Sequence, residues 1–265
     1  METEDPADGS DGTIICVENL EHAYGNFRAV DGISFAVRRG EIFSFLGPNG
    51  AGKSTAINVL ITLLALQKGR ATIAGYDVTK EPQKVRESIG IVFQDITLDR
   101  DMTVWELLEF HGRLYTMPTG ERRRRIDELL KLVQLEPKRN ELTKRLSGGM
   151  KRRLEIARGL MTRPKVLFLD EPFSALDYEM TLFIRDKLQE IYLKTGVTMV
   201  IVSHNLEDAV FLSDKILLLT RRPTRIAEYM PFAMARPRDP ASMSDPDFVT
   251  TKAHALEVFQ REVRA

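Results

Sequence analysis

The stretch Glu41-Ile-Phe-Ser-Phe-Leu-Gly-Pro-Asn-Gly-Ala-Gly-Lys-Ser-Thr55 determines the fold class, because an apolar strand runs directly into a glycine-rich turn and then into a helix. We predict the strand over Glu41–Leu46 and the helix over about Lys53–Ala65. The turn satisfies the pattern G-x-x-x-x-G-K-[ST] in the context that this phosphate-binding motif requires. Its glycines allow the backbone to wrap closely round phosphate oxygens, and its N–H groups form a nest for an anion.

This loop predicts that the chain binds a nucleoside triphosphate. Lys53 would place a point charge at the β- and γ-phosphates, and the hydroxyl of Ser54 would be a ligand of Mg²⁺. The predicted nucleotide-binding residues of the loop are Gly47, Pro48, Asn49, Gly50, Ala51, Gly52, Lys53, Ser54 and Thr55. The motif does not indicate what the energy of the nucleotide is used for.

The length and composition suit one large α/β domain or two subdomains around a core. The chain has 265 residues, of which 43% are apolar and 29% charged, and its formal net charge is zero. A neutral chain is not built to neutralise many phosphates, which argues against a nucleic-acid partner. Cys16 is the only cysteine, so no internal disulfide can form, as suits a reducing cytosol. No apolar run is long enough to span a bilayer, so work at a membrane would need another chain to do the spanning.

Strand and helix patterns alternate along most of the chain, which predicts a mostly parallel sheet covered by helices on both faces. Two early strands, separated by the turn Gly25-Asn26, add an antiparallel β part at the N-terminus. Helical periodicity between Thr103 and Gly159 interrupts the alternation and predicts an inserted helical subdomain. The predicted strands besides Glu41–Leu46 are Thr13–Leu20, Gly32–Val37, Val166–Leu169, Met199–Val202 and Ile216–Leu219.

Charge and composition predict the less regular parts of the chain. Residues 1–12 are acidic, small and unpatterned, so we expect them to be disordered. The main domain is expected over 13–222, with its helical subdomain at about 95–160, and a tail over 223–265 ends in a helix from Asp247 to Val263. The basic run Arg122–Arg125 begins one of the helices, and we interpret it as a solvated helix face.

Two carboxylates follow the strand Val166–Leu169. Because Asp170 and Glu171 come directly after four apolar residues, they should reach the carboxyl edge of the sheet, where ligands of open α/β sheets bind. Asp170 can enter the shell of Mg²⁺, and Glu171 can orient and activate a water for in-line attack on the γ-phosphate. Adjacent carboxylates after a strand also occur as helix N-caps, but the phosphate loop favours the catalytic interpretation.

These motifs and several others occur in the order typical of an ABC-type ATPase, the nucleotide-binding subunit of ATP-binding cassette transporters. The chain resembles that P-loop family from Ile14 to about Leu219. The residues that carry the resemblance are Gly47–Thr55, Gln94, Leu146–Met150, Asp170-Glu171, Ser174–Asp177 and His204. The resemblance implies that Tyr24 stacks on adenine and that Gln94 touches Mg²⁺ and the attacking water. It also implies that His204 lies at the γ-phosphate and that Asp177 lies at the seam of a dimer.

The resemblance also gives a role to the second glycine-rich stretch, Leu146–Met150. In such ATPases two cassettes enclose two ATP molecules head to tail. Ser147, Gly148 and Gly149 would therefore cap the γ-phosphate of ATP held by the partner's phosphate loop. Because each motif occurs once here, the chain must form a homodimer or pair with a sister ATPase subunit. The implied function is Mg²⁺-dependent ATP hydrolysis that drives separate transmembrane permease subunits at the cytoplasmic face of the membrane.

The motifs give conflicting indications of the direction of transport. Segments that resemble daunorubicin-type drug exporters are Ile89–Gln94, Leu107–Tyr115 and Ser147–Arg158, and segments that resemble nitrate, sulfonate and taurine importers are Asp170–Asp177, Ser203-His204 with Glu207–Leu212, and Arg222–Ile226. The resemblance implies that the glutamine loop and the helical subdomain contact the membrane subunit, so it favours export of drug-like or lipid-like substrates over import. A recombined or engineered sequence would also explain the mixture.

Two other classes of P-loop protein are alternatives. A soluble ABC ATPase that acts on nucleic acid or ribosomes would usually carry a coiled-coil insert or two fused cassettes, and the sequence has neither. In a P-loop kinase, the stretch Ser147–Gly149 and His204 would have no role.

Overall fold

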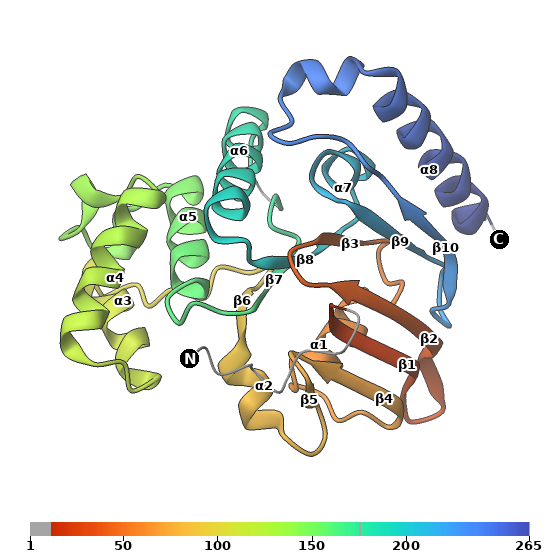
Figure 1. Ribbon diagram of the computed structural model, residues 1–265, viewed down its shortest axis with the longest axis horizontal. Coiled ribbons are helices and arrows are strands. Elements are labelled where there is room, and N and C mark those ends of the chain that lie inside the picture. Colours follow the sequence, from red (N-terminus) through yellow and green to blue (C-terminus); the bar gives the residue numbers. More distant parts are fainter. Residues whose placement is uncertain (1–11, 175, 265) are drawn as a thin grey trace.

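The computed structural model describes residues 12–174 and 176–264. The predicted disorder of residues 1–12 therefore falls, except for Gly12, outside the described residues. Figure 1 shows a larger sheet at the centre, a smaller sheet below it, a group of helices beside one edge and a long helix near the C-terminus. This arrangement positions the site, because loops after the strands of the larger sheet gather at one of its edges. The smaller sheet and the helices lie around that edge.

The larger sheet has six strands in the order β10-β9-β3-β8-β7-β6. Neighbouring strands pair in parallel except β10, which runs antiparallel to β9 at one edge. All five residues of the central strand β3 are buried, as expected when both faces of a parallel sheet are covered. The predicted α/β class with a mostly parallel sheet is confirmed. The strands are β3 Ile42–Leu46, β6 Ile89–Val92, β7 Val166–Asp170, β8 Thr198–Ser203, β9 Lys215–Leu219 and β10 Ile226–Pro231.

The smaller sheet is antiparallel and contains the N-terminal hairpin, as predicted. Its strands, in the order β2-β1-β4-β5, are β1 Thr13–Tyr24, β2 Phe27–Arg38, β4 Lys68–Ile73 and β5 Tyr76–Asp77. The hairpin is longer than predicted, because strand pairing continues until Tyr24 lies opposite Phe27 and only Gly25-Asn26 remains as the turn. Strands β4 and β5 carry no strand prediction from the sequence.

Helix α1 Lys53–Leu60 packs against β1, β2 and β4 and so joins the two sheets through one apolar core. It ends before the predicted Ala65. Thr62 adopts a left-handed φ of 64°, and the amide of Leu63 donates back to the carbonyl oxygen of Asn58 at 2.8 Å. This turn sends the chain into β4, so the apolar residues after the helix belong to a connection.

The helical block lies beside the β6 edge of the larger sheet (Figure 1). Thr103 begins it with a capping box, in which its side chain and that of Glu106 each bond the other's backbone amide. The helices are α3 Val104–Leu114, α4 Thr119–Leu132 and α5 Gly148–Gly159, with α2 Pro82–Ser88 before β6 and 3-10 turns at Glu136–Lys138 and Thr143–Arg145.

The interpretation of Arg122–Arg125 as a solvated face is wrong at two positions. Arg122 is buried and donates to both carboxylate oxygens of Glu109, at 2.8 Å each. Arg125 turns inward and donates to the carbonyl oxygen of Leu160 at 2.8 Å. The reason is helical spacing, since Arg122 lies four positions before the buried Ile126, and Arg125 lies four before the buried Leu129.

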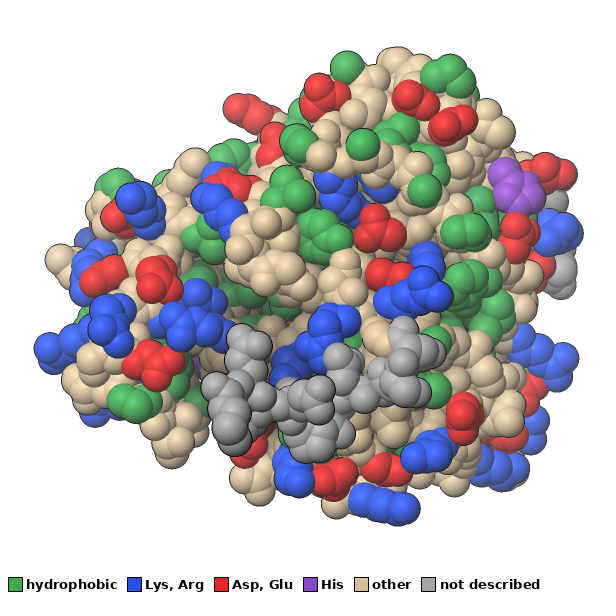
Figure 2. All heavy atoms as spheres, viewed as in Figure 1, with side chains coloured by type: hydrophobic (Ala, Val, Ile, Leu, Met, Phe, Trp, Pro, Cys, Tyr) green, Lys and Arg blue, Asp and Glu red, His purple; other side chains and the backbone are tan. Residues whose placement is uncertain are grey.

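The C-terminal third of the chain contains three helices, which lie beside the larger sheet (Figure 1). They are α6 Tyr178–Thr195, α7 Leu206–Leu212 and α8 Pro246–Arg264, with a 3-10 turn at Pro240–Ser244. Helix α8 agrees with the predicted final helix and contacts α7, β9 and β10. On the face seen in Figure 2, basic and acidic side chains are interspersed. Among the described residues, no helix has the length and apolar character needed to cross a bilayer.

Candidate functional site

A cavity of about 290 Å³ opens where β3 leads into α1. Its walls come from parts of the chain that are far apart in sequence. The phosphate-loop residues Asn49–Thr55 line it together with Gln94, Glu171, His204 and Arg222. The first three of these additional residues were predicted to share a site, and the structure brings them together. Arg222 was not predicted.

The phosphate loop has the backbone shape of an anion nest. Gly50 and Gly52 adopt φ values of 79° and 87°, which side chains other than glycine rarely tolerate. A Cβ on Gly52 would lie 2.9 Å from the carbonyl oxygen of Ala29, so close packing also requires glycine there. The ammonium of Lys53 donates to the carbonyl oxygens of Gly47, at 2.6 Å, and Pro48, at 3.1 Å. Burial lowers the pKa of Lys53, while the nearby Glu171 and Asp170 raise it.

Glu171 and His204 form a hydrogen-bonded pair in the same cavity. Glu171 follows β7, is buried, and has a left-handed φ of 44° held by the bond from its amide to the Val202 carbonyl oxygen at 3.0 Å. Its Oε2 lies 2.8 Å from Nδ1 of His204. The imidazole is about half exposed, so it reaches the carboxylate from the open side of the cavity. A carboxylate in a strained loop beside an exposed imidazole can orient a water and stabilise charge that develops near it.

Asp170 occupies the last position of β7 beside Glu171. Its Oδ1 is buried and has no hydrogen-bond partner among the described residues. Burial is the main cause that raises the pKa of Asp170 to about 6, and the charge of Glu171 adds to the rise. A buried carboxylate oxygen without a donor fits a site for a hard cation such as Mg²⁺, which prefers oxygen ligands. Asp170 does not line the cavity itself, whereas Ser54 and Gln94, the other predicted Mg²⁺ ligands, do.

Arg152 of α5 ties this edge of the sheet to the helical block. Its buried guanidinium donates to the carbonyl oxygens of Glu171 and Pro172, at 2.8 Å each, and pairs with Glu155 at 3.0 Å. Glu155 is fully buried and accepts from the amide of Thr97 at 2.9 Å. Helix α5 is therefore attached both to the end of β7 and to the segment after Gln94. The sequence signal for this clamp is a pair of opposite charges three residues apart on a buried helix face.

Eight predicted site residues lie outside the cavity lining. Ser147 caps α5 by accepting from the amide of Met150 at 3.3 Å, and Asp177 caps α6 by accepting from the amide of Met180 at 2.7 Å. Tyr24, at the tip of the hairpin, is half exposed and meets the ring of His22 edge to face at 4.9 Å. The complete set outside the lining is Tyr24, Gly47, Pro48, Ser147, Gly148, Gly149, Asp170 and Asp177.

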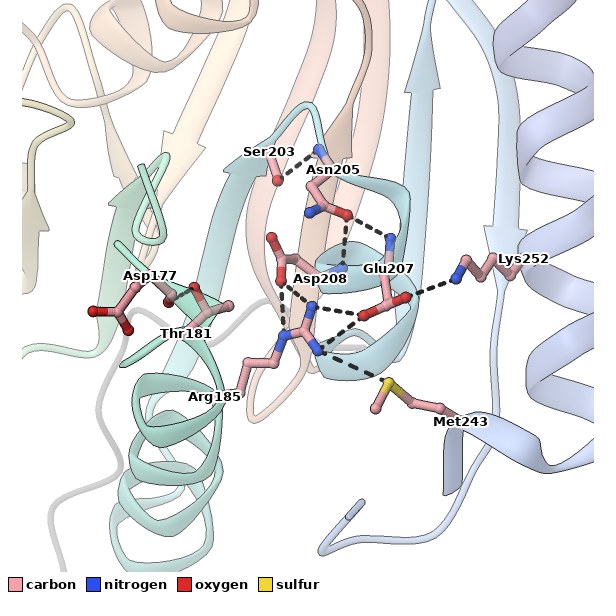
Figure 3. A network of polar contacts seen from close by, with 9 residues as sticks. All are labelled: Asp177, Thr181, Arg185, Ser203, Asn205, Glu207, Asp208, Met243 and Lys252. Carbon is pink, nitrogen blue, oxygen red and sulfur yellow. Dashed lines mark hydrogen bonds and ion pairs between the residues drawn. The ribbon is translucent and has the colours of Figure 1, made fainter. Parts of the chain in front are cut away.

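The helix that follows His204 is held by a polar network (Figure 3). The side chain of Asn205 caps α7 by accepting from the amide of Glu207 at 2.9 Å. Arg185 of α6 donates to Asp208 at 2.7 Å, and Lys252 of α8 pairs with Glu207 at 2.7 Å. Helices α6, α7 and α8 thus meet at side chains that sequence reasoning does not identify.

The family model, the similar proteins and the similar solved structures all belong to ABC transporters. The family model described as "ABC transporter" matches residues 30–174. A linearmycin resistance ATP-binding protein, LnrL, of Bacillus subtilis is 40% identical over 199 residues, 75% of this chain and 64% of that protein. A probable sulfate/thiosulfate import ATP-binding protein, CysA, of Chlorella vulgaris is 38% identical over 205 residues, 77% of this chain and 86% of that protein. The solved structure of cbiO1 from Clostridium perfringens, part of the ABC transporter complex cbiONQ, superposes with a TM-score of 0.77 at 30% identity and covers 92% of this chain and 95% of its own. This chain thus spans less than two thirds of the length of the linearmycin relative.

Proposed function

This chain belongs to the ABC transporter family, and on that premise we propose that it is the ATP-hydrolysing subunit of a membrane transporter. One observation carries the proposal. The phosphate loop and the pair Glu171–His204, joined at 2.8 Å, face the same cavity. A site for plain nucleotide binding needs only the loop. A carboxylate and an imidazole beside it can orient and activate a water for attack on a phosphate.

The residues of the cavity divide the work of hydrolysis. The loop amides and Lys53 bind the phosphate chain of ATP and offset its charge. Glu171 orients the attacking water and accepts its proton. With Glu171 ionised, Nδ1 of His204 carries the proton of their hydrogen bond, so Nε2 is left to meet the water or the γ-phosphate. Mg²⁺ held by Ser54, Asp170 and Gln94 would supply positive charge to the β- and γ-phosphates.

We propose that a second cassette completes the site. Ser147 and Gly148 are exposed at the start of α5 and do not line the cavity of their own chain. They can therefore serve a nucleotide held by a partner, as a helix N-terminus that offers backbone N–H groups to a phosphate. Asp177 and Tyr178 are also exposed, at the start of α6, where a dimer seam would bury them. The partner is a second copy or a sister ATPase subunit, and transmembrane permease subunits hold the pair at the cytoplasmic face of the membrane.

For the direction of transport we propose export. The support is the exporter-like sequence of β6 with Gln94, of α3 and of α5, which together border the β6 edge where the helical block begins. Import is the second candidate, and the loop around Arg222, which resembles importer ATPases, favours it. Purification of the chain with its membrane partner separates the two candidates. An ABC-2-type permease means export, and a six-helix permease with a binding protein means import.

The variant Glu171→Gln tests the hydrolytic mechanism. We expect it to lose ATP turnover and to accumulate as an ATP-bound dimer, because the water is no longer activated while the phosphates are still held. Size-exclusion chromatography with saturating Mg-ATP measures this directly. A monomeric Glu171→Gln variant under those conditions would contradict the two-cassette site. Ser147→Ala is the matched variant, since it should leave ATP binding by the monomer unchanged and weaken the closed dimer.

A further inference from the structure

The loop between β9 and β10 contributes Arg222 to the wall of the nucleotide cavity. Its anchor is Thr224, which is fully buried. The amide of Thr224 donates to the Ala29 carbonyl oxygen at 3.0 Å, and its carbonyl oxygen accepts from the amide of Asp31 at 2.9 Å. The Thr224 hydroxyl lies within hydrogen-bonding reach of the carbonyl oxygens of Ala29 and of Ala51, the latter in the phosphate loop. The loop is thus attached both to the hairpin and to the phosphate site.

Arg222 projects from this anchored loop into the cavity lining. Its guanidinium lies over the ring of Phe27, with 5.5 Å between the guanidinium carbon and the ring centroid. Phe27 is the strand partner of Tyr24 at the tip of the hairpin. On its other side, Nη2 of Arg222 would lie 3.9 Å from a Cβ built on Gly50. The guanidinium therefore stands between the hairpin tip and the phosphate loop.

The charge of Arg222 has no ionic or hydrogen-bonding partner within residues 12–174 and 176–264. Among the described residues it makes neither an ion pair nor a hydrogen bond, and the Phe27 ring is what positions it. The other basic group of the cavity, Lys53, is buried and turned towards carbonyl oxygens of its own loop. A planar guanidinium with free donors, held over an aromatic ring beside a phosphate nest, matches a phosphate oxygen in charge and in geometry.

We propose that Arg222 binds the phosphate chain of the nucleotide held by its own phosphate loop, from the nucleoside side. This inference rests on the proposed function and adds a residue to that site. The side follows from position, since the guanidinium of Arg222 lies over Phe27, the strand partner of Tyr24, whereas Glu171 and His204 line the cavity where the γ-phosphate reacts. The phosphates that Arg222 contacts are therefore those that ADP and ATP share.

Isothermal titration of the full chain with Mg-ADP and with Mg-ATP tests this assignment. Arg222→Ala should weaken both nucleotides by roughly three- to tenfold at low salt, as expected for a partly exposed charge contact, and by less at high salt. Arg222→Lys should keep part of the affinity, because it retains the charge without the fork of donors. Arg221→Ala is the matched control, since Arg221 is exposed, is adjacent and does not line the cavity, and its affinity should stay at the wild-type value.

Unchanged affinity of Arg222→Ala for Mg-ADP would overturn the assignment, and so would an equal loss in Arg221→Ala, which would indicate a diffuse effect of net charge. A third variant distinguishes this failure from failure of the proposed function. Lys53→Ala should abolish nucleotide binding whatever Arg222 does. If the wild-type chain and Lys53→Ala bind Mg-ATP equally, the nucleotide site itself is wrong. If only Arg222→Ala behaves as wild type, the inference fails and the proposed function stands.

Discussion

Replacing Arg185 by methionine should destabilise the folded chain severely, because Arg185 is the buried cation that joins α6 to Asp208 and Glu207 of α7 (Figure 3). Its side chain is 3% exposed, and its Nε lies 2.7 Å from an oxygen of Asp208, which is 2% exposed. Its two terminal nitrogens lie 3.3 Å from Glu207. Methionine keeps much of the aliphatic bulk and removes the charge, so the variant isolates the electrostatic part of the contact.

The size of the effect follows from what is left behind. Glu207 keeps Lys252 at 2.7 Å, so the loss falls on Asp208, which remains buried without a cation. Removing one member of a buried ion pair costs about 3–5 kcal/mol. Loss of the contact with the Phe211 ring, 5.2 Å from the guanidinium carbon, adds less than about 1 kcal/mol. We expect a decrease of about 4 kcal/mol in the free energy of unfolding, or roughly 10 °C in Tm for a chain of this size.

The loss of stability in Arg185→Met should become smaller as the pH falls. Burial raises the pKa of Asp208 above its ordinary value, and Arg185 opposes that rise. Without Arg185 the pKa of Asp208 in the folded state rises further above its unfolded value. The folded variant then binds a proton more tightly than the unfolded chain, so its stability relative to wild type improves as pH falls through the raised pKa. The penalty should be full at pH 8 and smaller at pH 5.

Equilibrium urea unfolding at the two pH values measures the penalty. The double variant Arg185→Met/Asp208→Asn should recover at least half of it, because no buried charge is then left alone. Lys194→Met is the control on the same helix, since its pair with Glu190 is 60% exposed at the lysine and should contribute less than about 1 kcal/mol. A single-variant penalty below about 1 kcal/mol, or a double variant no more stable than the single one, would refute this reasoning.

Two glycines and one threonine give further predictions. Gly52→Ala should lower ATP affinity more than tenfold by calorimetry and cost about 2 kcal/mol in urea unfolding. The reason is that alanine is strained at φ 87° and its Cβ would contact the carbonyl oxygen of Ala29. Wild-type ATP affinity in this variant would refute the prediction. Gly149→Ala should cost about 1–2 kcal/mol, since its Cβ would clash with the sulfur of Met180, and a second change, Met180→Ala, should relieve the clash in a melting experiment. Thr224→Val should cost about 1 kcal/mol through the lost hydroxyl bond, and an unchanged urea midpoint would argue against that bond.

Short-range pattern was sufficient for the phosphate loop, the carboxylates after β7 and the α/β class. Each depends on covalent neighbours: glycines at fixed spacing, a strand that ends in Asp170 and Glu171, and apolar runs of strand length. The same pattern failed where local and tertiary demands differ. Apolar residues after α1 continue a helical period, yet Thr62 turns the chain because β4 must reach the smaller sheet. Arginine is usually a surface residue, yet the ion pair of Arg122 on α4 with Glu109 on α3 makes its burial favourable.

The rest of the site came from contacts that no local pattern encodes. Thr224 meets Ala51 across 173 positions, and Arg152 meets Glu171 across 19. Arg222 enters the cavity because β9 pairs beside β3 and so places its following loop against the phosphate loop. Sequence records the donors and acceptors of these bonds, but which of them meet depends on strand order. Strand order is determined by the free energy of packing the whole core. The contacts that form the wall of the cavity therefore exist only in the folded chain.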